Sequence, residues 1–553
     1  MVDGSIGLVE ADSVNLKAYC SWKNCSQAIS ELKFSPDGKL LAAGSRDGNI
    51  YIYVCNDDRK TFRRQAVCRG HSSCVTHIDF SSNSMYLQSN GSDLALLMWD
   101  IQGNQIKSVS SLRDIVWATL TCVLGWSVQG IFDKRGSYDG VNACSAVPQV
   151  GDIVTGNTDH SVKLFRYPSL SPGSLHQSYR GHASTVTCVR FSYNRRHVIS
   201  LGGDDCTVLL WAHTMEQAES SDDEDANPES LPGSPRVPDG AVMDTRKEIG
   251  DVGPRSLLQE AVNSNQTAEV IAQIARLEGP NRGQGDRAAQ PWKCAITEPS
   301  SWNASTGGTD VDLELQWIHG YRAHDCRNNV RYSAAGSVVY TAAAVGIVYS
   351  KSAGKQKFFL GAHCDDIISL AAHPSGQLFA TGETGRQPSI IVWSSQDVHT
   401  VARMDFSHKI GIPLLSFNSR GDLLASVGLD EDHTLVVHDW AKNITILRTP
   451  TDKRKVLCMC YLADLASSLK PSLPLTAANA TATNYDYKIA SNNIIVTAGY
   501  KHIKFWWNQG QNISSQRGIY GKEERETIIS VASGTPGEPC YVYVRAPPFL
   551  MDL

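Results

Sequence analysis

Apolar and polar residues alternate along most of the chain in short runs, and turn residues separate these runs. From Phe34 to Tyr53 the sequence reads FSPDGKLLAAGSRDGNIYIY. Turns at Asp37-Gly38 and Asp47-Gly48 divide this stretch into three short segments with the character of β-strands. The pattern predicts an antiparallel β-meander.

The meander recurs, and similar stretches end at Asp100, Phe165 and Trp211. In each copy an aspartate precedes an aromatic residue by six positions, and the pairs are Asp47/Tyr53, Asp93/Trp99, Asp159/Phe165 and Asp205/Trp211. The aspartate can hydrogen-bond the backbone of its own turn, and the aromatic ring then falls on the buried face of the next strand. Periodic self-similarity of this kind predicts a repeat architecture.

Glycine-histidine pairs support the same interpretation. Gly70-His71 and Gly181-His182 place a histidine 22 and 23 residues before the aspartate of its copy. This arrangement resembles the WD40 repeat, whose blades of about 40 to 45 residues build β-propellers. We therefore expect both imidazoles to satisfy buried hydrogen bonds near the repeat's aspartate, with no role in acid-base chemistry.

A second, degenerate series follows. Tyr349, Trp393, His438 and Trp506 occupy the aromatic register, and Asp432 keeps the six-residue spacing to His438. A last copy begins near residue 527 and does not complete a blade. The sequence thus predicts an all-β protein with four WD40 blades, then four blades and a fragment, in tandem propellers whose closure is left open.

Between the two series the composition becomes polar and acidic. Residues 214–290 carry 15 acidic and 7 basic side chains, a net charge of −8, so the rest of a chain of charge −5 carries +3. Such a segment cannot bury enough apolar surface to fold alone, which predicts a mostly disordered linker. Near-helical apolar spacing predicts a helix over 254–277. Ser220 and Ser221 beside the acidic run ESSDDED, and Ser234 before Pro235, resemble kinase substrates.

Overall composition narrows the class of protein. The chain has 553 residues, of which 42% are hydrophobic, 19% charged and 8% aromatic, as in globular proteins. The net charge argues against nucleic-acid binding. The first ten residues lack a signal-peptide pattern, no apolar run is long enough to span a membrane, and the 15 cysteines form no CxxC pair. We expect a cytoplasmic protein with reduced thiols.

Catalytic and ligand-binding motifs are missing from the sequence. There is no HExxH, GxxxxGK[ST] or GxSxG pattern. We therefore expect no enzyme activity, no cofactor and no metal site. Basic clusters between strands or at their ends are candidate contacts for a protein partner, or else solvated loop charges: Arg63, Arg64, Arg195, Arg196, Lys453, Arg454 and Lys455.

Two stretches carry a more specific resemblance. Trp317 to Val330, WIHGYRAHDCRNNV, is similar to the end of the HELP motif of the echinoderm microtubule-associated protein-like (EML) family. Leu124 to Ile131, LGWSVQGI, with the following YDGVN at 138–142, resembles that family's second-propeller signature. In the family a HELP motif opens each unit of two propellers, so the order here resembles the end of one unit followed by the start of the next, as in a shortened form of a member with repeated units.

The resemblance implies four parts and a function. The parts are second-propeller blades at 1–213, the linker at 214–291, a HELP-like segment at 292–330 and first-propeller blades at 331–553. The implied function is a non-catalytic platform that binds tubulin or microtubules in the cytoplasm and cytoskeleton and modifies microtubule assembly. The alternative is a scaffold that assembles a signalling or ciliary complex without touching tubulin. The N-terminal trimerising coiled coil of shorter members is not seen.

Overall fold

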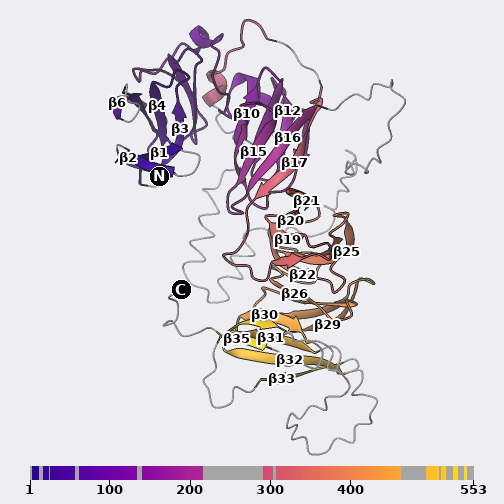
Figure 1. Cartoon of the computed structure of the whole chain (residues 1–553). Coiled ribbons are helices and arrows are strands. Elements are labelled where there is room, and N and C mark those ends of the chain that lie inside the picture. The colour runs from indigo at the N-terminus through magenta and orange to yellow at the C-terminus, as the bar shows by residue number, and fades with distance from the viewer. Residues whose placement is uncertain are drawn as a thin grey trace, which may run out of the picture. The chain divides into compact units, whose positions relative to one another are not determined.

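The computed structural model describes residues 3–11, 16–23, 25–56, 61–133, 140–215, 291–302, 307–462, 494–509, 512–518, 527–532 and 541–544. Most of them belong to one unit made of Met1–Glu216 and Ala295–Leu553 (Figure 1). The linker helix expected at 254–277 and the serines Ser220, Ser221 and Ser234 lie outside the described residues.

The described strands form seven four-stranded sheets, one three-stranded sheet and two two-stranded sheets. The four-stranded sheets consist of β3 (Ile29–Phe34), β4 (Leu40–Ser45), β5 (Asn49–Cys55) and β6 (Phe62–Arg69); β10 (Val141–Val147), β11 (Asp152–Asn157), β12 (Val162–Arg166) and β13 (His176–Tyr179); β14 (Val186–Phe191), β15 (His197–Gly202), β16 (Val208–Met215) and β17 (Val311–His319); β18 (Val330–Tyr332), β19 (Val338–Ala342), β20 (Val345–Ser350) and β21 (Lys355–Phe359); β22 (Ile367–Ala372), β23 (Leu378–Glu383), β24 (Ile390–Ser394) and β25 (Thr400–Met404); β26 (Leu414–Phe417), β27 (Leu423–Val427), β28 (Leu435–Asp439) and β29 (Ile444–Thr449); and β30 (Val456–Tyr461), β31 (Ile495–Gly499), β32 (His502–Gln509) and β33 (Asn512–Arg517).

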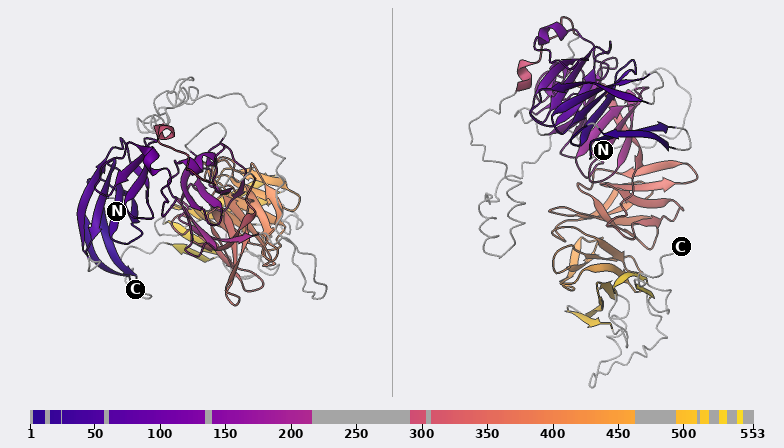
Figure 2. Two further views of the ribbon diagram at one scale, coloured as in Figure 1. Left: turned by 90° about the horizontal axis from the view of Figure 1, so that it is seen from above. Right: turned by 90° about the vertical axis from the view of Figure 1, so that its left-hand side faces the viewer.

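The remaining elements are shorter. The three-stranded sheet contains β7 (Val75–Phe80), β8 (Tyr86–Gly91) and β9 (Leu96–Asp100), and the two-stranded sheets pair β1 (Ser5–Ala11) with β2 (Leu16–Lys23) and β34 (Ile528–Ala532) with β35 (Tyr541–Val544). The 3₁₀-helices are η1 (Val109–Leu112), η2 (Trp126–Ile131) and η3 (Pro291–Cys294). Figure 2 shows the same sheets, each a twisted antiparallel ribbon, from two further directions. The prediction of an all-β protein built from WD40-type blades in two series is confirmed.

Two irregularities recur at fixed places in these blades. Where the first and second strands pair, the register often shifts at the start of the first strand, as between Ile29 and Glu31 or Val456 and Cys458. Where the third and fourth strands pair, it often shifts after the fourth residue or so of the third strand, as between Ile52 and Tyr53. Both shifts are β-bulges. A shift at the start of the first strand is typical of a first–second strand pair, and a shift in the middle of the third strand is typical of a third–fourth pair.

One blade is built from both sides of the linker. Strand β17 pairs with β16 along its length, from Met215 opposite Val311 to Val208 opposite His319. Residues 216–310 therefore stand between the third and fourth strands of a single sheet. The HELP-like segment, expected to open the second series, supplies the last strand of the fourth blade.

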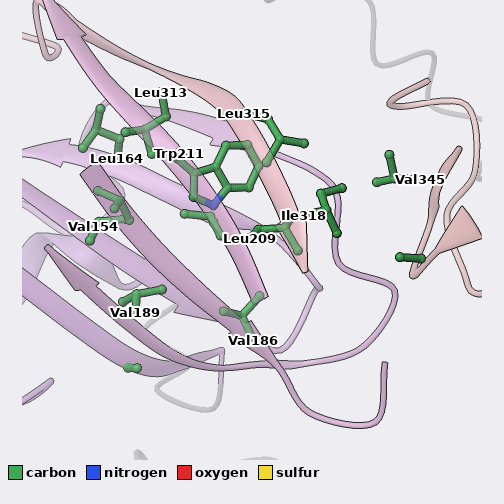
Figure 3. Packing of buried hydrophobic residues seen from close by; sticks show 14 of the residues in the cluster. Val154, Leu164, Val186, Val189, Leu209, Trp211, Leu313, Leu315, Ile318 and Val345 are labelled. Atoms are coloured by element: carbon green, nitrogen blue, oxygen red, sulfur yellow. The ribbon is translucent and has the colours of Figure 1, made fainter. Parts of the chain in front are cut away.

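The core of this blade continues into the next sheet. Trp211 on β16 packs with Leu313, Leu315 and Ile318 of β17, and the same buried cluster extends to Val345 on β20 (Figure 3). Alternate residues of β17 are buried, as expected for a strand with one face in the core. The strand from beyond the linker is thus an integral part of the packing.

Candidate interaction surfaces and the buried histidine sites

The first glycine-histidine pair leads into a closed set of hydrogen bonds. His71 Nδ1 lies 3.1 Å from both carboxylate oxygens of Asp93, and His71 Nε2 lies 2.8 Å from Ser89 Oγ. Trp99 Nε1 donates to the same Ser89 oxygen at 2.8 Å. Asp93 also accepts a hydrogen bond from the Ala95 amide in its own turn. Four side chains from one blade therefore satisfy one another.

The second pair repeats this geometry. His182 Nδ1 is 3.1 Å from Asp205 Oδ2, and His182 Nε2 is 2.8 Å from Ser200 Oγ. Trp211 Nε1 donates to Ser200 Oγ at 2.9 Å. The backbone amides of Ala183 and Thr207 donate to the carboxylate of Asp205 at 3.0 and 3.1 Å. The carboxylate thereby joins the loop before β14 to the turn before β16.

Two further sites of this kind lie in the second series. His363 Nε2 is 2.7 Å from Thr381 Oγ1, and its Nδ1 is 3.1 Å from Glu383. Trp393 is fully buried on β24 in the same blade. The acid here is Glu383 at the end of β23, ten residues before Trp393, so a search for aspartate six residues before an aromatic residue misses this site.

In the next blade His408 Nε2 lies 2.8 Å from Ser426 Oγ, and His408 Nδ1 lies 4.0 Å from Asp430. The amide of Thr434 donates to Asp430 at 3.0 Å. Asp430 therefore occupies the position that the six-residue spacing assigns to Asp432, whose side chain is exposed. The spacing fails because this turn is two residues longer.

The other expected repeat positions have their own partners. Asp159 accepts from the Ser161 amide at 3.1 Å and lies 3.1 Å from Lys163 Nζ. Trp506 Nε1 donates to Thr497 Oγ1 at 2.9 Å. Asp159 stabilises the turn before β12, and Trp506 joins β32 to β31. Among the described residues of these two blades, no histidine precedes the first strand.

Burial keeps the first imidazole neutral. Burial lowers the pKa of His71 and outweighs the opposing effect of the Asp93 charge. Burial by itself raises the pKa of Asp93, but the Ser72 amide, His71 and the Ala95 amide together bring that pKa below its usual value. A neutral imidazole next to a carboxylate donates through Nδ1, which leaves Nε2 to accept from Ser89.

Serine, histidine and aspartate in this order resemble a hydrolytic triad, yet the surroundings differ. The Oγ of a nucleophilic serine must be open to substrate. Ser89 and Ser200 are completely buried, and each oxygen already accepts a tryptophan N–H. These sites hold strands together and leave no room for a substrate carbonyl.

Among the described residues, no group of three or more histidine, cysteine, aspartate or glutamate side chains is arranged to hold a metal ion. None of the helices in the described part of the chain has the length and apolar character needed to cross a bilayer.

The basic clusters fall at opposite ends of their sheets. Arg63 and Arg64 are exposed at the start of β6, and Arg195 and Arg196 are exposed in the turn between β14 and β15. In a four-stranded meander the first turn and the start of the fourth strand lie at the same end. Residues Lys453–Lys455 precede β30, a first strand, and so lie at the other end of their blade.

The central residue of this last cluster is held in place. Arg454 Nε lies 3.1 Å from Asp452, and Arg454 Nη1 donates to the Lys501 carbonyl at 3.0 Å. Lys453 and Lys455 on either side are exposed. The structure thus brings Arg63, Arg64, Arg195 and Arg196 to equivalent ends of two sheets and separates them from Lys453 and Lys455.

The HELP-like segment is bound on both flanks by side chains. Arg166 Nη1 donates to Asp310 Oδ2 at 2.7 Å and to the Gly308 carbonyl at 3.2 Å. On the other flank the Ile318 amide donates to Gln356 Oε1 at 2.8 Å, while Gln356 Nε2 donates to the Ile318 carbonyl at 3.1 Å. One glutamine therefore satisfies both backbone groups of Ile318 and joins β17 to β21.

Blades of four antiparallel strands with buried histidine, hydroxyl, acid and tryptophan side chains define a WD40-repeat β-propeller protein. Three segments of the chain match models of known protein families. Residues 1–213 match the second β-propeller of echinoderm microtubule-associated proteins, residues 309–347 match the HELP motif, and residues 354–394 match the WD domain, G-beta repeat. Residues 1–213 and 309–347 are thus similar to two segments of the echinoderm microtubule-associated proteins.

Individual relatives agree. The chain is 35% identical over 214 residues to echinoderm microtubule-associated protein-like 4 of Xenopus laevis, which covers 38% of this chain and 23% of the relative. It is 38% identical over 187 residues to human echinoderm microtubule-associated protein-like 1, and the match covers 34% of this chain and 23% of the relative. It is 36% identical over 211 residues to rat echinoderm microtubule-associated protein-like 2, and the match covers 38% of this chain and 32% of the relative. The matches span less than a third of each relative's length.

Proposed function

We propose that the chain is a non-catalytic WD40 platform that binds tubulin or microtubules and modifies microtubule assembly in the cytoplasm. The match of residues 1–213 to the second propeller of echinoderm microtubule-associated proteins carries this proposal. The relatives bear names that associate them with microtubules. Propellers present rigid loops and strand edges to protein partners, which suits this role.

The charge distribution supports an acidic partner. The acidic linker accounts for a net −8, and the remainder of the chain carries +3. Exposed arginines Arg63, Arg64, Arg195 and Arg196 are the contacts that we assign to the acidic surface of a microtubule. Such contacts weaken as salt screens them, because the screening length falls from about 10 Å at 0.1 M to about 3 Å at 1 M.

Co-pelleting with polymerised microtubules at low and high salt tests the proposal. We expect the chain to pellet at low salt and to be released as salt rises. The double variants Arg63→Glu/Arg64→Glu and Arg195→Glu/Arg196→Glu should each bind about tenfold more weakly or worse, because like charges then face each other.

The control is Lys453→Glu/Lys455→Glu, which reverses the same amount of charge on exposed residues at the opposite end of a blade. If the control weakens binding equally, only net charge matters and the assigned contacts are wrong. Salt-insensitive pelleting would also remove the arginines from the mechanism.

The alternative is a WD40 scaffold that assembles other proteins without touching tubulin. No pelleting, together with no binding of free tubulin dimers, would reject the first proposal and leave this one. The absence of an open nucleophile at the histidine sites supports a non-catalytic role for either function.

A further inference from the structure

The turn between β14 and β15 is held by a closed set of hydrogen bonds. The Ser192 amide donates to the His197 carbonyl at 2.8 Å, and the Arg195 amide donates to the Ser192 carbonyl at 2.9 Å. Asn194 Oδ1 accepts from Ser192 Oγ at 2.7 Å and from the Arg196 amide at 3.1 Å. The His197 amide donates to Ser192 Oγ at 3.0 Å. The backbone of this surface turn is therefore fixed.

The same two backbone hydrogen bonds, at 2.8 to 3.1 Å, close the turns between β3 and β4, β7 and β8, β22 and β23, and β26 and β27. The fourth residues of these turns and of the β14–β15 turn are Gly38, Ser84, Gly376, Gly421 and Arg195, with φ of 71°, 61°, 67°, 81° and 62°. This left-handed region favours glycine and is unfavourable for a residue with a Cβ atom. Arg195 thus has a backbone conformation that most of the equivalent turns give to glycine.

The β14–β15 turn also carries the largest side chain at its second position. Tyr193 is fully exposed there. The other four turns have Pro36, Ser82, Pro374 and Ser419 at this position. Arg195 and Arg196 are exposed as well. Because all three side chains lie outside the core, the packing of the blade does not account for them.

These side chains suit a contact with another protein. An unfavourable backbone conformation that brings no packing in return indicates a role outside folding. Tyrosine and arginine are among the residues most enriched at the centres of protein interfaces. A guanidinium group also binds a carboxylate through two parallel hydrogen bonds, so the arginines complement an acidic partner.

We propose that Tyr193, Arg195 and Arg196 form the central anchor of the surface that contacts the acidic microtubule. The Tyr193 ring packs against the partner, and the two guanidinium groups bind its carboxylates. Because the turn already fixes the backbone, binding orders fewer groups. Arg63 and Arg64, at the equivalent end of another sheet, then act as peripheral charges that attract the partner. This proposal rests on the proposed function.

Co-pelleting of the full chain with polymerised microtubules tests the uncharged member of the anchor. Tyr193→Ser changes no charge and places in this turn the residue that two equivalent turns have. We expect binding to be roughly tenfold weaker or worse, as for a central tyrosine of an interface. The ratio to the unchanged chain should be the same at low and high salt, because salt does not screen a ring contact.

The matched control is Tyr500→Ser. Tyr500 is exposed and precedes Lys501, which also has a positive φ, of 55°. It lies in the turn between β31 and β32, at the opposite end of its blade. Binding should be unchanged in this variant.

Arg195→Gly tests the arginine apart from its effect on folding. Glycine suits the left-handed conformation, so the midpoint of urea unfolding should stay equal or rise. Binding should weaken, and the loss should shrink as salt rises. A lower urea midpoint would give Arg195 a structural role and overturn the proposal.

Unchanged pelleting of Tyr193→Ser, or an equal loss in the Tyr500 control, overturns the anchor and leaves the proposed function intact. A full chain that does not pellet at any salt concentration instead rejects the proposed function, and with it the partner assigned to the anchor.

Discussion

Each buried histidine site depends on a small hydroxyl group that accepts one hydrogen bond and donates another. Ser89 and Ser200 lie between an imidazole and an indole, and Ser426 faces His408. The separation from histidine to hydroxyl is 18 residues in four blades, including His363 and Thr381, whereas the separation from histidine to acid varies. The constant separation follows from the pairing of the first and second strands, which places the hydroxyl residue at a fixed distance along the chain from the start of the first strand.

The carboxylate of Asp205 is predicted to be the most sensitive member of its site. Asp205→Ala leaves His182 and the amides of Ala183 and Thr207 without their acceptor in a buried place. Unsatisfied buried groups cost about 1 to 3 kcal/mol each, so we expect a loss of about 3 kcal/mol or more. Urea denaturation measures it.

Asp204 is the control, since it is the exposed neighbour of the buried aspartate. Asp204→Ala should change stability by less than about 0.5 kcal/mol. Equal effects of the two substitutions would show that the buried hydrogen bonds contribute nothing specific.

His438 is predicted to make the protein sensitive to acid. Burial, with His408 and Arg448 nearby, lowers the pKa of His438 to about 4. In the unfolded chain the imidazole titrates near about 6.5, so between these values the unfolded state binds more protons. The stability contributed by neutral His438 is complete above about pH 6.5 and is lost as pH falls toward 4, by about 2 to 3 kcal/mol.

His438→Phe should therefore reduce the fall in unfolding free energy between pH 7 and pH 4.5, measured by urea denaturation at both values. Packing changes affect both pH values alike and cancel in this difference. His399→Phe, at a largely exposed histidine, should leave the fall unchanged. An unchanged fall in the His438 variant would mean that folding does not lower the pKa of this histidine.

At the scale of elements, the pairing of β16 with β17 makes the linker an insertion within one blade. The strands have eight paired positions, and the apolar side of β17 enters the core of its blade. A cut in the linker therefore severs the chain without removing a strand from its sheet. The two fragments should remain associated.

We predict that a protease site introduced within residues 236–250 and then cleaved yields two fragments that co-elute in native buffer and separate in urea. The same cut combined with Leu313→Asp places a charge at a buried position of β17 and should release the fragments. Fragments that separate without denaturant, in the chain with Leu313 intact, would contradict the observed pairing.

Strands within blades could be predicted from sequence because their signals are local. Alternating residues and turn aspartates mark β3 to β5 and β14 to β16 directly. The partner of β16 could not be found in this way, because it lies beyond a long acidic segment and nothing nearby in sequence points to it. The two-stranded sheet β1–β2 was also missed, since Val9 stands where other copies have an aromatic residue, six positions after Asp3.

At the scale of the whole molecule, local sequence patterns likewise do not reveal which candidate contact residues share an end of the blades. Sequence could identify basic clusters, but only the strand order shows that Arg63 and Arg195 lie at equivalent ends of their sheets and Lys453 at the other. Hydrogen bonds of Arg454 to Asp452 likewise depend on a turn whose shape the sequence does not reveal. Local sequence patterns therefore predict the repeats, whereas the order of the paired strands determines which basic clusters lie at the same end of the blades.

Strand β17 also has a consequence for how the chain is made. A ribosome delivers β16 as an edge strand and must add residues 216–310 before its neighbour exists. At about 5 to 20 residues per second this wait lasts several seconds or more. During this time the acidic run ESSDDED, which follows β16 closely in the sequence, is already part of the nascent chain. Charged residues next to an unpaired strand oppose aggregation. We therefore expect the acidic run to oppose aggregation of this unpaired strand during synthesis.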